Sequence, residues 1–122
     1  MSEKSLPPEI QQMLVQYQTL REHQVRIDAE LKLVEAELSD IESILDTLKN
    51  TSDDVELYKA LGHVIIKKSK AEVVKELEDR KELLIVKRDK YRKQLDFVNK
   101  QVSELEAKIK EALSKHGLTA SR

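Results

Sequence analysis

The sequence predicts an all-α dominated fold, a long antiparallel two-helix coiled coil with a short β-hairpin inserted between the helices. Two series of apolar residues with alternating spacings of three and four predict it, because such a series lines one face of a helix that packs on another helix. The first series runs from Ile10 to Leu48 and is interrupted only by Gln24. The second runs from Val74 to Ala112, with Lys81 and Arg88 as its polar members. Their equal lengths favour one chain folding back on itself over a parallel homodimer.

The seam of this coiled coil follows from pairing the two series in opposite directions. Positions whose numbers sum to about 122 then face each other. The charged residues in 28–46 are mostly acidic, and the facing residues 76–94 are richer in Lys and Arg, which favours the same register. Lys81 and Arg88 are expected to lay their side chains on the facing helix and to direct their charges toward those acids. The seam residues that we single out are Leu31, Leu38, Leu45, Leu77, Leu84, Tyr91, Leu95 and Leu105.

The first helix is expected over residues 8–49, after a frayed N-terminal tail at 1–7. Pro7 and Pro8 mark its start, because proline suits the first helical turn and not the middle of a helix. Residues 50–54 prefer turns and caps, so the helix should end before them.

The segment 50–68 is expected to contain a turn and two short strands. Here the heptad stops, and Val64, Ile65 and Ile66 form a β-branched run that follows the Gly62-His63 dipeptide. A disordered linker is the alternative, although linkers seldom carry this much apolar side chain.

The second helix is expected over 69–116, followed by a C-terminal tail at 117–122. Ser69 and Glu72 have the spacing of a capping box, in which each side chain accepts from the other residue's backbone N–H. Gly117 is placed to adopt the left-handed conformation that ends many helices.

Composition excludes several classes of protein. The 122 residues carry a net charge of −1, which argues against general binding of nucleic acid. There is no cysteine, no apolar stretch of roughly 18 residues and no secretory signal, so a cytoplasmic protein without a membrane partner is expected. Abundant charge of both signs and few glycines would also suit a thermophile.

No catalytic or metal-binding constellation is apparent, so we expect no enzyme, no cofactor and no metal. The three histidines His23, His63 and His116 are far apart along the chain. Glu35 and Glu37 are two residues apart on a helix and point in different directions. Two glycines cannot form a phosphate-binding loop.

Apolar residues outside the seam form two groups, and the first lies in and beside the predicted strands. An isolated two-stranded hairpin is marginal in water and its edges favour pairing with another chain, so this group is expected to mediate oligomerisation. The alternative is that the hairpin folds back onto its own helices. The proposed oligomerisation residues are Leu57, Tyr58, Leu61, Gly62, Val64, Ile65 and Ile66.

The second group lies where the two termini meet, and nothing in the chain is expected to cover it. The functional interpretation is weak and adaptable binding of apolar clients. The alternative is that these are apolar side chains without a function at frayed helix ends. Val15 belongs to this group, and the seam residues Ile10 and Met13 lie beside it. The proposed client-binding residues are Leu6, Ile10, Met13, Leu14, Leu113 and Leu118.

The predicted hairpin carries a specific pattern. An aromatic residue precedes Lys59, Gly62 follows three positions on, and an apolar triplet is closed by Lys67. This pattern resembles the hairpin of the prefoldin beta-subunit family, especially its archaeal form. Residues 8–12 and 74–83 also resemble the openings of the family's two helices, and the resemblance covers roughly residues 6–115.

The resemblance implies an ATP-independent holdase chaperone. It implies a hexamer of two alpha-type subunits and four beta-type subunits, whose hairpins join into small β-barrels from which the coiled coils extend. The coiled-coil tips would hold unfolded or nascent chains and transfer them to a group II chaperonin. The rival hypothesis is a structural or scaffolding coiled coil that docks one folded partner.

Overall fold

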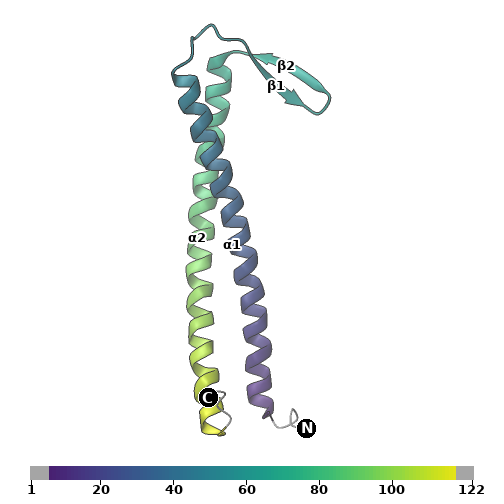
Figure 1. The fold of residues 1–122 in the computed structure, drawn as a ribbon, viewed down its shortest axis with the longest axis vertical. Coiled ribbons are helices and arrows are strands. Elements are labelled where there is room, and N and C mark those ends of the chain that lie inside the picture. Colours follow the sequence, from purple (N-terminus) through teal and green to yellow (C-terminus); the bar gives the residue numbers. More distant parts are fainter. Residues whose placement is uncertain (1–5, 118–122) are drawn as a thin grey trace. The chain divides into compact units, whose positions relative to one another are not determined.

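The computed structural model of the chain describes residues 6–117. Helix α1 spans Pro8–Lys49, strands β1 and β2 span Leu57–Leu61 and Val64–Lys68, and helix α2 spans Lys70–Lys115 (Figure 1). The predicted fold class of two long helices with an inserted antiparallel hairpin is confirmed. Most of the two predicted tails, and Leu118 with them, lies outside the described residues.

The chain divides into two compact units, each containing a stretch of both helices. We call residues 31–90, which include the hairpin, the hairpin unit. The described residues 6–30 and 91–117 form the terminal unit.

The terminal unit is held by an apolar core between its two helical stretches. Ile27, Val98 and Val102 are buried at its centre. Around them pack the half-buried side chains Tyr17, Leu20, Tyr91 and Leu95. All seven of these residues belong to the two predicted apolar series. The helix faces that meet here are therefore the ones that the 3.5-residue period predicts.

Polar contacts flank this core and agree with the predicted register. Gln24, the polar member of the first series, donates from Nε2 to Oδ1 of Asn99 at 2.5 Å. The Tyr17 hydroxyl donates to Oε2 of Glu106 at 2.8 Å, and this hydrogen bond raises the pKa of Tyr17. Both pairs join residues whose numbers sum close to the predicted 122.

The hairpin unit buries the remaining part of the same seam. Leu31, Val34, Leu38, Ile41, Leu48 and Leu84 are buried, and Leu45 and Leu77 are half-buried. Arg80 of α2 donates two hydrogen bonds to the Glu37 carboxylate of α1, at 2.7 and 2.9 Å. This bidentate contact lowers the pKa of Glu37 and raises that of Arg80. The ion pair therefore joins the same two helices that the buried apolar residues hold together.

The two seam cations of α2 behave differently. Nζ of Lys81 lies 3.9 Å from a carboxylate oxygen of Glu42 on the facing helix, as the charge pattern predicts. Arg88, which was also expected to reach facing acids, instead donates to Asp89 of its own helix at 3.3 Å. A long guanidinium side chain at the edge of the seam can satisfy its charge locally, so the sequence pattern does not decide its partner.

The ends of α2 have the expected caps. The Glu72 backbone N–H donates to the Ser69 hydroxyl at 3.1 Å, and the Ser69 backbone N–H donates to the Glu72 carboxylate at 2.9 Å. This backbone hydrogen bond is the main cause of the lowered pKa of Glu72. At the other end Gly117 has a φ of +67°, in the left-handed region that glycine adopts without strain.

Neighbouring leucines of α2 allow the seam packing to be tested. Leu84 is 1% exposed and Leu83 is 52% exposed. Leu84→Ala should lower the free energy of unfolding by about 2–5 kcal/mol, because it leaves a cavity in the seam. Leu83→Ala makes the same change in helix propensity at an exposed position and should cost about 0.5 kcal/mol or less. Urea denaturation followed by circular dichroism at one protein concentration measures both, and equal losses would contradict the seam assignment.

Candidate functional site

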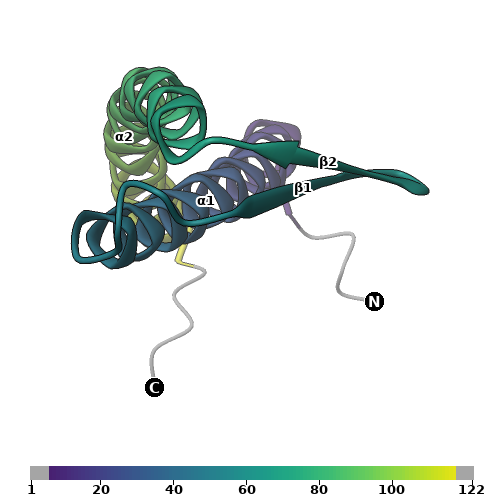
Figure 2. The same ribbon diagram turned by 90° about the horizontal axis from the view of Figure 1, so that it is seen from above.

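The hairpin is built around a two-residue turn. Leu61 pairs with Val64, and the Gly62-His63 dipeptide connects the strands. Gly62 has a φ of +58°, and no non-glycine residue of the described chain has a positive φ, which is the pattern of a type II′ turn. In Figure 2 the hairpin projects sideways from the adjoining ends of α1 and α2.

The apolar side chains of the hairpin are exposed. Ile65 is 70% exposed and Ile66 is 38% exposed. Tyr58, Leu61 and Val64 are exposed as well, whereas Leu57 is half-buried. The hairpin therefore does not fold back onto its own helices, which was the alternative to an assembly surface. A two-stranded sheet also leaves the outer backbone groups of both strands unpaired.

The strand register separates the hairpin into two faces. Because successive side chains alternate, Tyr58, Ala60, Ile65 and Lys67 share one face, which we call the outer face. The other face, the inner face, carries the lysines that reach α2. The inner-face residues are Leu57, Lys59, Leu61, Val64, Ile66 and Lys68.

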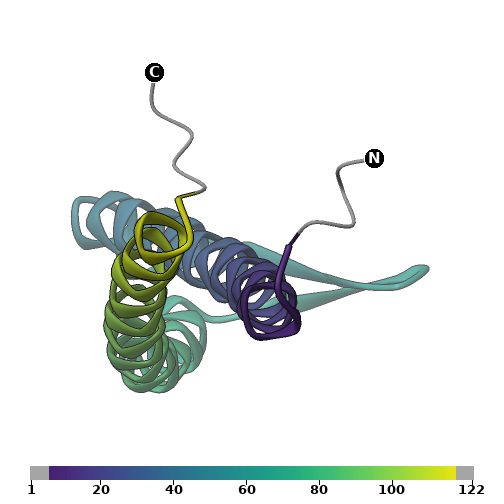
Figure 3. The same ribbon diagram turned by 90° about the horizontal axis from the view of Figure 1, so that it is seen from below.

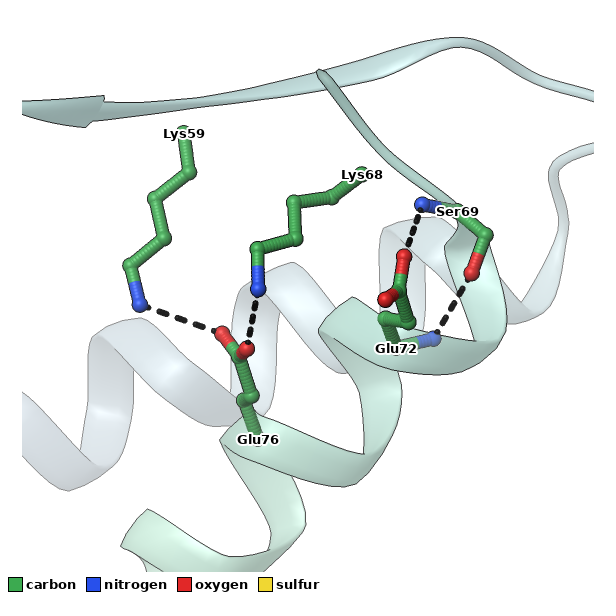
Figure 4. Close-up of polar contacts among 5 residues, drawn as sticks. All are labelled: Lys59, Lys68, Ser69, Glu72 and Glu76. Atoms are coloured by element: carbon green, nitrogen blue, oxygen red, sulfur yellow. Dashed lines mark hydrogen bonds and ion pairs between the residues drawn. The ribbon is translucent and has the colours of Figure 1, made fainter. Parts of the chain in front are cut away.

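One carboxylate of α2 binds both strands. Lys59 of β1 donates to Oε1 of Glu76 at 3.2 Å, and Lys68 of β2 donates to Oε2 of the same residue at 2.7 Å (Figure 4). The hydrogen bond from Lys68 is the largest cause of the lowered pKa of Glu76, followed by that from Lys59. The same contact raises the pKa of Lys68. Glu76 is thus charged and shared between β1 and β2.

Further polar contacts involve the segment that leads from α1 into the hairpin. Nζ of Lys70, at the start of α2, donates to the Thr51 carbonyl at 2.7 Å and lies 3.2 Å from Oδ1 of Asp53. On the outer face, Glu56 accepts from the Tyr58 hydroxyl at 3.0 Å and from Lys67 at 3.4 Å. Sequence reasoning missed this polar network, because its members are ordinary surface residues whose partners are set only by folding.

The proposed client-binding residues that the structure describes lie at the end of the terminal unit where α1 begins and α2 ends (Figure 3). Leu14 and the neighbouring Val15 are exposed. Leu6, Met13 and Leu113 are half-buried. The expectation that nothing in the chain covers this group is wrong for Ile10, which is 0% exposed and lies in the core. Ile10 belongs to the apolar series of the seam, so its side chain lies on the face of α1 that is buried.

Two grooves lie beside these residues within the terminal unit. The larger has a volume of about 730 Å³. Its apolar lining residues are Met13, Val15, Leu20 and Leu105, and its polar and charged lining residues are Glu9, Gln12, Gln16, Thr19, Gln101, Glu104 and Lys108. The smaller has a volume of about 280 Å³ and is lined by Leu14, Tyr17, Glu106, Ile109 and Lys110. Each groove combines apolar side chains of both helices, which the heptad pattern alone does not reveal.

The beginning of α1 is poor in charge. Between residues 6 and 20 the only charged side chain is Glu9, whereas 37% of the whole chain is charged. Glutamine supplies most of the polarity instead, at positions 11, 12, 16 and 18. An uncharged surface of this kind neither attracts nor repels the charged residues that flank an apolar segment of another protein.

Among residues 6–117, no cluster of His, Asp and Glu is arranged to hold a metal ion. The described helices also include none that is long and apolar enough to span a membrane.

Comparisons with known proteins agree on one family. The family model described as "Prefoldin subunit" matches residues 11–116. A prefoldin subunit beta of Saccharolobus islandicus is 41% identical over 116 residues, which cover 95% of this chain and 91% of the relative. A prefoldin subunit beta of Sulfolobus acidocaldarius is 36% identical over 91% of this chain and 89% of the relative.

A solved structure supports the same assignment. The crystal structure of the prefoldin beta subunit from Thermococcus strain KS-1 superposes with a TM-score of 0.81 at 30% identity. The superposition covers 89% of this chain and 96% of that chain. With the hairpin between two long helices, these matches show that the chain belongs to the prefoldin family of chaperone subunits, as an archaeal-type beta subunit.

Proposed function

We propose that the chain is a subunit of an ATP-independent holdase, which binds unfolded or nascent polypeptides at the ends of its helices and transfers them to a group II chaperonin. A chaperone role, within a hetero-oligomer, follows from the family. The way in which clients are held and passed on is the proposal. A cytoplasmic location remains part of it.

The observation that carries the proposal is the exposed apolar surface at the charge-poor beginning of α1. Leu14 and Val15 are exposed there, and each of the two grooves beside them has apolar side chains of both helices in a lining that also holds polar and charged residues. Met13 lines the larger groove, and its unbranched side chain adapts to irregular apolar surfaces. Such contacts are weak and unspecific, which suits the capture of many different unfolded chains.

Assembly would convert these weak contacts into retention. We propose a hexamer of two alpha-type subunits and four copies of this beta-type chain, joined through their hairpins. The exposed apolar side chains and the free strand edges of the hairpin support this mode of assembly. Several subunits in one complex hold a client by avidity, while each single contact stays free to release.

An aggregation assay without nucleotide tests the holdase function. The chain, mixed with an alpha-type subunit, should suppress aggregation of a chemically unfolded test protein without ATP, when the complex and the test protein are present at nearly equal concentrations. A scaffold that docks one folded partner predicts no suppression, and that result would contradict the proposal.

Adding a group II chaperonin with ATP to the captured client tests the transfer step. Recovery of the native test protein should then exceed that obtained with either component alone. Recovery equal to that of the chaperonin alone would contradict transfer and leave only the holdase part of the proposal.

A further inference from the structure

We propose that Glu76 is a positioning residue for assembly, because it holds β1 and β2 to α2 and so sets the direction in which the hairpin projects from the helices of the hairpin unit. The inference rests on the proposed assembly through the hairpin. It assigns to that assembly a specific side chain that acts through the direction of the hairpin.

The first step is the geometry of the shared carboxylate. Each oxygen of Glu76 accepts from a different strand, Oε1 from Lys59 at 3.2 Å and Oε2 from Lys68 at 2.7 Å (Figure 4). The side chains of Lys59 and Lys68 share the inner face of the hairpin. A single carboxylate therefore holds both strands and resists rotation of the hairpin better than a contact with one strand would.

The second step concerns the neighbouring carboxylate of α2. Glu72 lies four residues before Glu76, so the two lie on the same side of the helix. The Glu72 carboxylate accepts from the Ser69 backbone N–H and completes the capping box. The hydrogen bonds of the cap and those of Glu76 thus involve different carboxylates. Replacement of Glu76 should therefore leave the capping box at the start of α2 in place.

The third step is the need for a fixed direction. The hairpin is connected to the helices by Ser69 on one side and by residues 50–56 on the other. Its exposed apolar side chains show that packing against its own helices contributes little to its placement. A hairpin held in one direction loses less conformational entropy when it meets other hairpins, so preorganisation favours assembly.

Solvent exposure separates this role from a role in the stability of the fold. The side chains of Glu76, Lys59 and Lys68 are 41%, 46% and 22% exposed. Ion pairs of this exposure add little to folding stability. We therefore expect changes at Glu76 to alter assembly and to leave the unfolding transition of the helices nearly unchanged.

Charge reversal tests the proposal. Glu76→Lys places three lysines together and should raise the subunit concentration needed for half-assembly with an alpha-type subunit by about tenfold, since two attractions become repulsions. The matched control is Glu78→Lys, which makes the same charge change two residues further along α2 at an exposed position. Sedimentation velocity over a concentration series measures both, with circular dichroism as the check on folding.

Rescue distinguishes positioning from a general effect of charge. In the Glu76→Lys background, Lys59→Glu and Lys68→Glu together should restore assembly to within about threefold of the original chain, because both pairs re-form with opposite sign. Absence of rescue would overturn the proposal. So would equal effects of Glu76→Lys and the Glu78→Lys control.

Neutralisation and salt give an independent measurement. Assembly of the original chain should weaken in 1 M salt, where charges are screened beyond about 3 Å. Glu76→Gln should assemble less well at low salt and depend less on salt. An identical salt dependence of the two proteins would overturn the proposal.

Failure of this inference is distinguishable from failure of the proposed assembly. If Glu76→Lys assembles like the original chain while aspartates at Ile65 and Ile66 dissociate the complex, only the role of Glu76 is wrong. If the aspartate variant also assembles, the proposed assembly through the hairpin is itself wrong.

Discussion

Replacing Ile65 and Ile66 with Asp together is expected to leave folded helices that no longer sediment as a large complex. The two side chains lie on opposite faces of the hairpin, 70% and 38% exposed. Whichever face another subunit covers, the variant buries a charge there without a partner, which costs several kcal/mol at each interface. Because the helices bury a separate seam, their circular dichroism should stay close to that of the original chain.

The single variants show which face of the hairpin is covered. Ile65→Asp changes only the outer face, and Ile66→Asp changes only the inner face. A matched control is Val25→Asp with Phe97→Asp, which introduces two charges at exposed apolar positions of the terminal unit. The control should assemble normally. An intact complex in the Ile65 and Ile66 double variant would remove the hairpin from the proposed interface.

Replacing Met13, Leu14, Val15 and Leu113 with Ser together is expected to preserve assembly and abolish suppression of aggregation. These residues are exposed or half-buried at the end of the terminal unit. Each change removes apolar surface worth roughly 25 cal/mol per Å² in contact with a client. The loss is repeated on every subunit of this type, so avidity falls much more steeply than the affinity of one arm.

Ile10 is kept in this variant because it is 0% exposed. Its replacement would open a cavity in the terminal unit and confuse loss of client contact with loss of packing. The matched control is Val25→Ser with Phe97→Ser, two exposed apolar side chains outside this end. The control should suppress aggregation like the original chain. If the four-residue variant also does so, clients are held elsewhere on the complex.

Much of the fold was predictable because local rules act within a few residues. The spacing of the two apolar series selects the helix faces that pack, and all the buried apolar residues of the described chain belong to those series. The capping box at Ser69 and Glu72 and the left-handed Gly117 follow from backbone groups that need partners at helix ends. The hairpin turn at Gly62 follows in the same way from the conformational freedom of glycine.

The candidate sites were only partly predictable. The sequence marks the hairpin residues and the apolar residues near the termini, but spacing does not say how much of each side chain stays exposed. Ile10 illustrates this, because it belongs both to the seam series and to the end of the helix. Only the packing of the folded chain shows that its side chain is buried. The roles proposed for these surfaces in assembly and client binding stay predictions that the variants above test.

By itself, the sequence determined the two-helix architecture, the helix register, the inserted hairpin and the resemblance to prefoldin beta subunits. These features depend on periodicity and on short motifs, which are local along the chain. Only the tertiary structure decided that Ile10 is buried, that Arg88 binds Asp89, and that Glu76 holds both strands. The physical reason is that exposure and ion-pair partners depend on which side chains folding brings together from distant positions, and many charged residues compete for each partner.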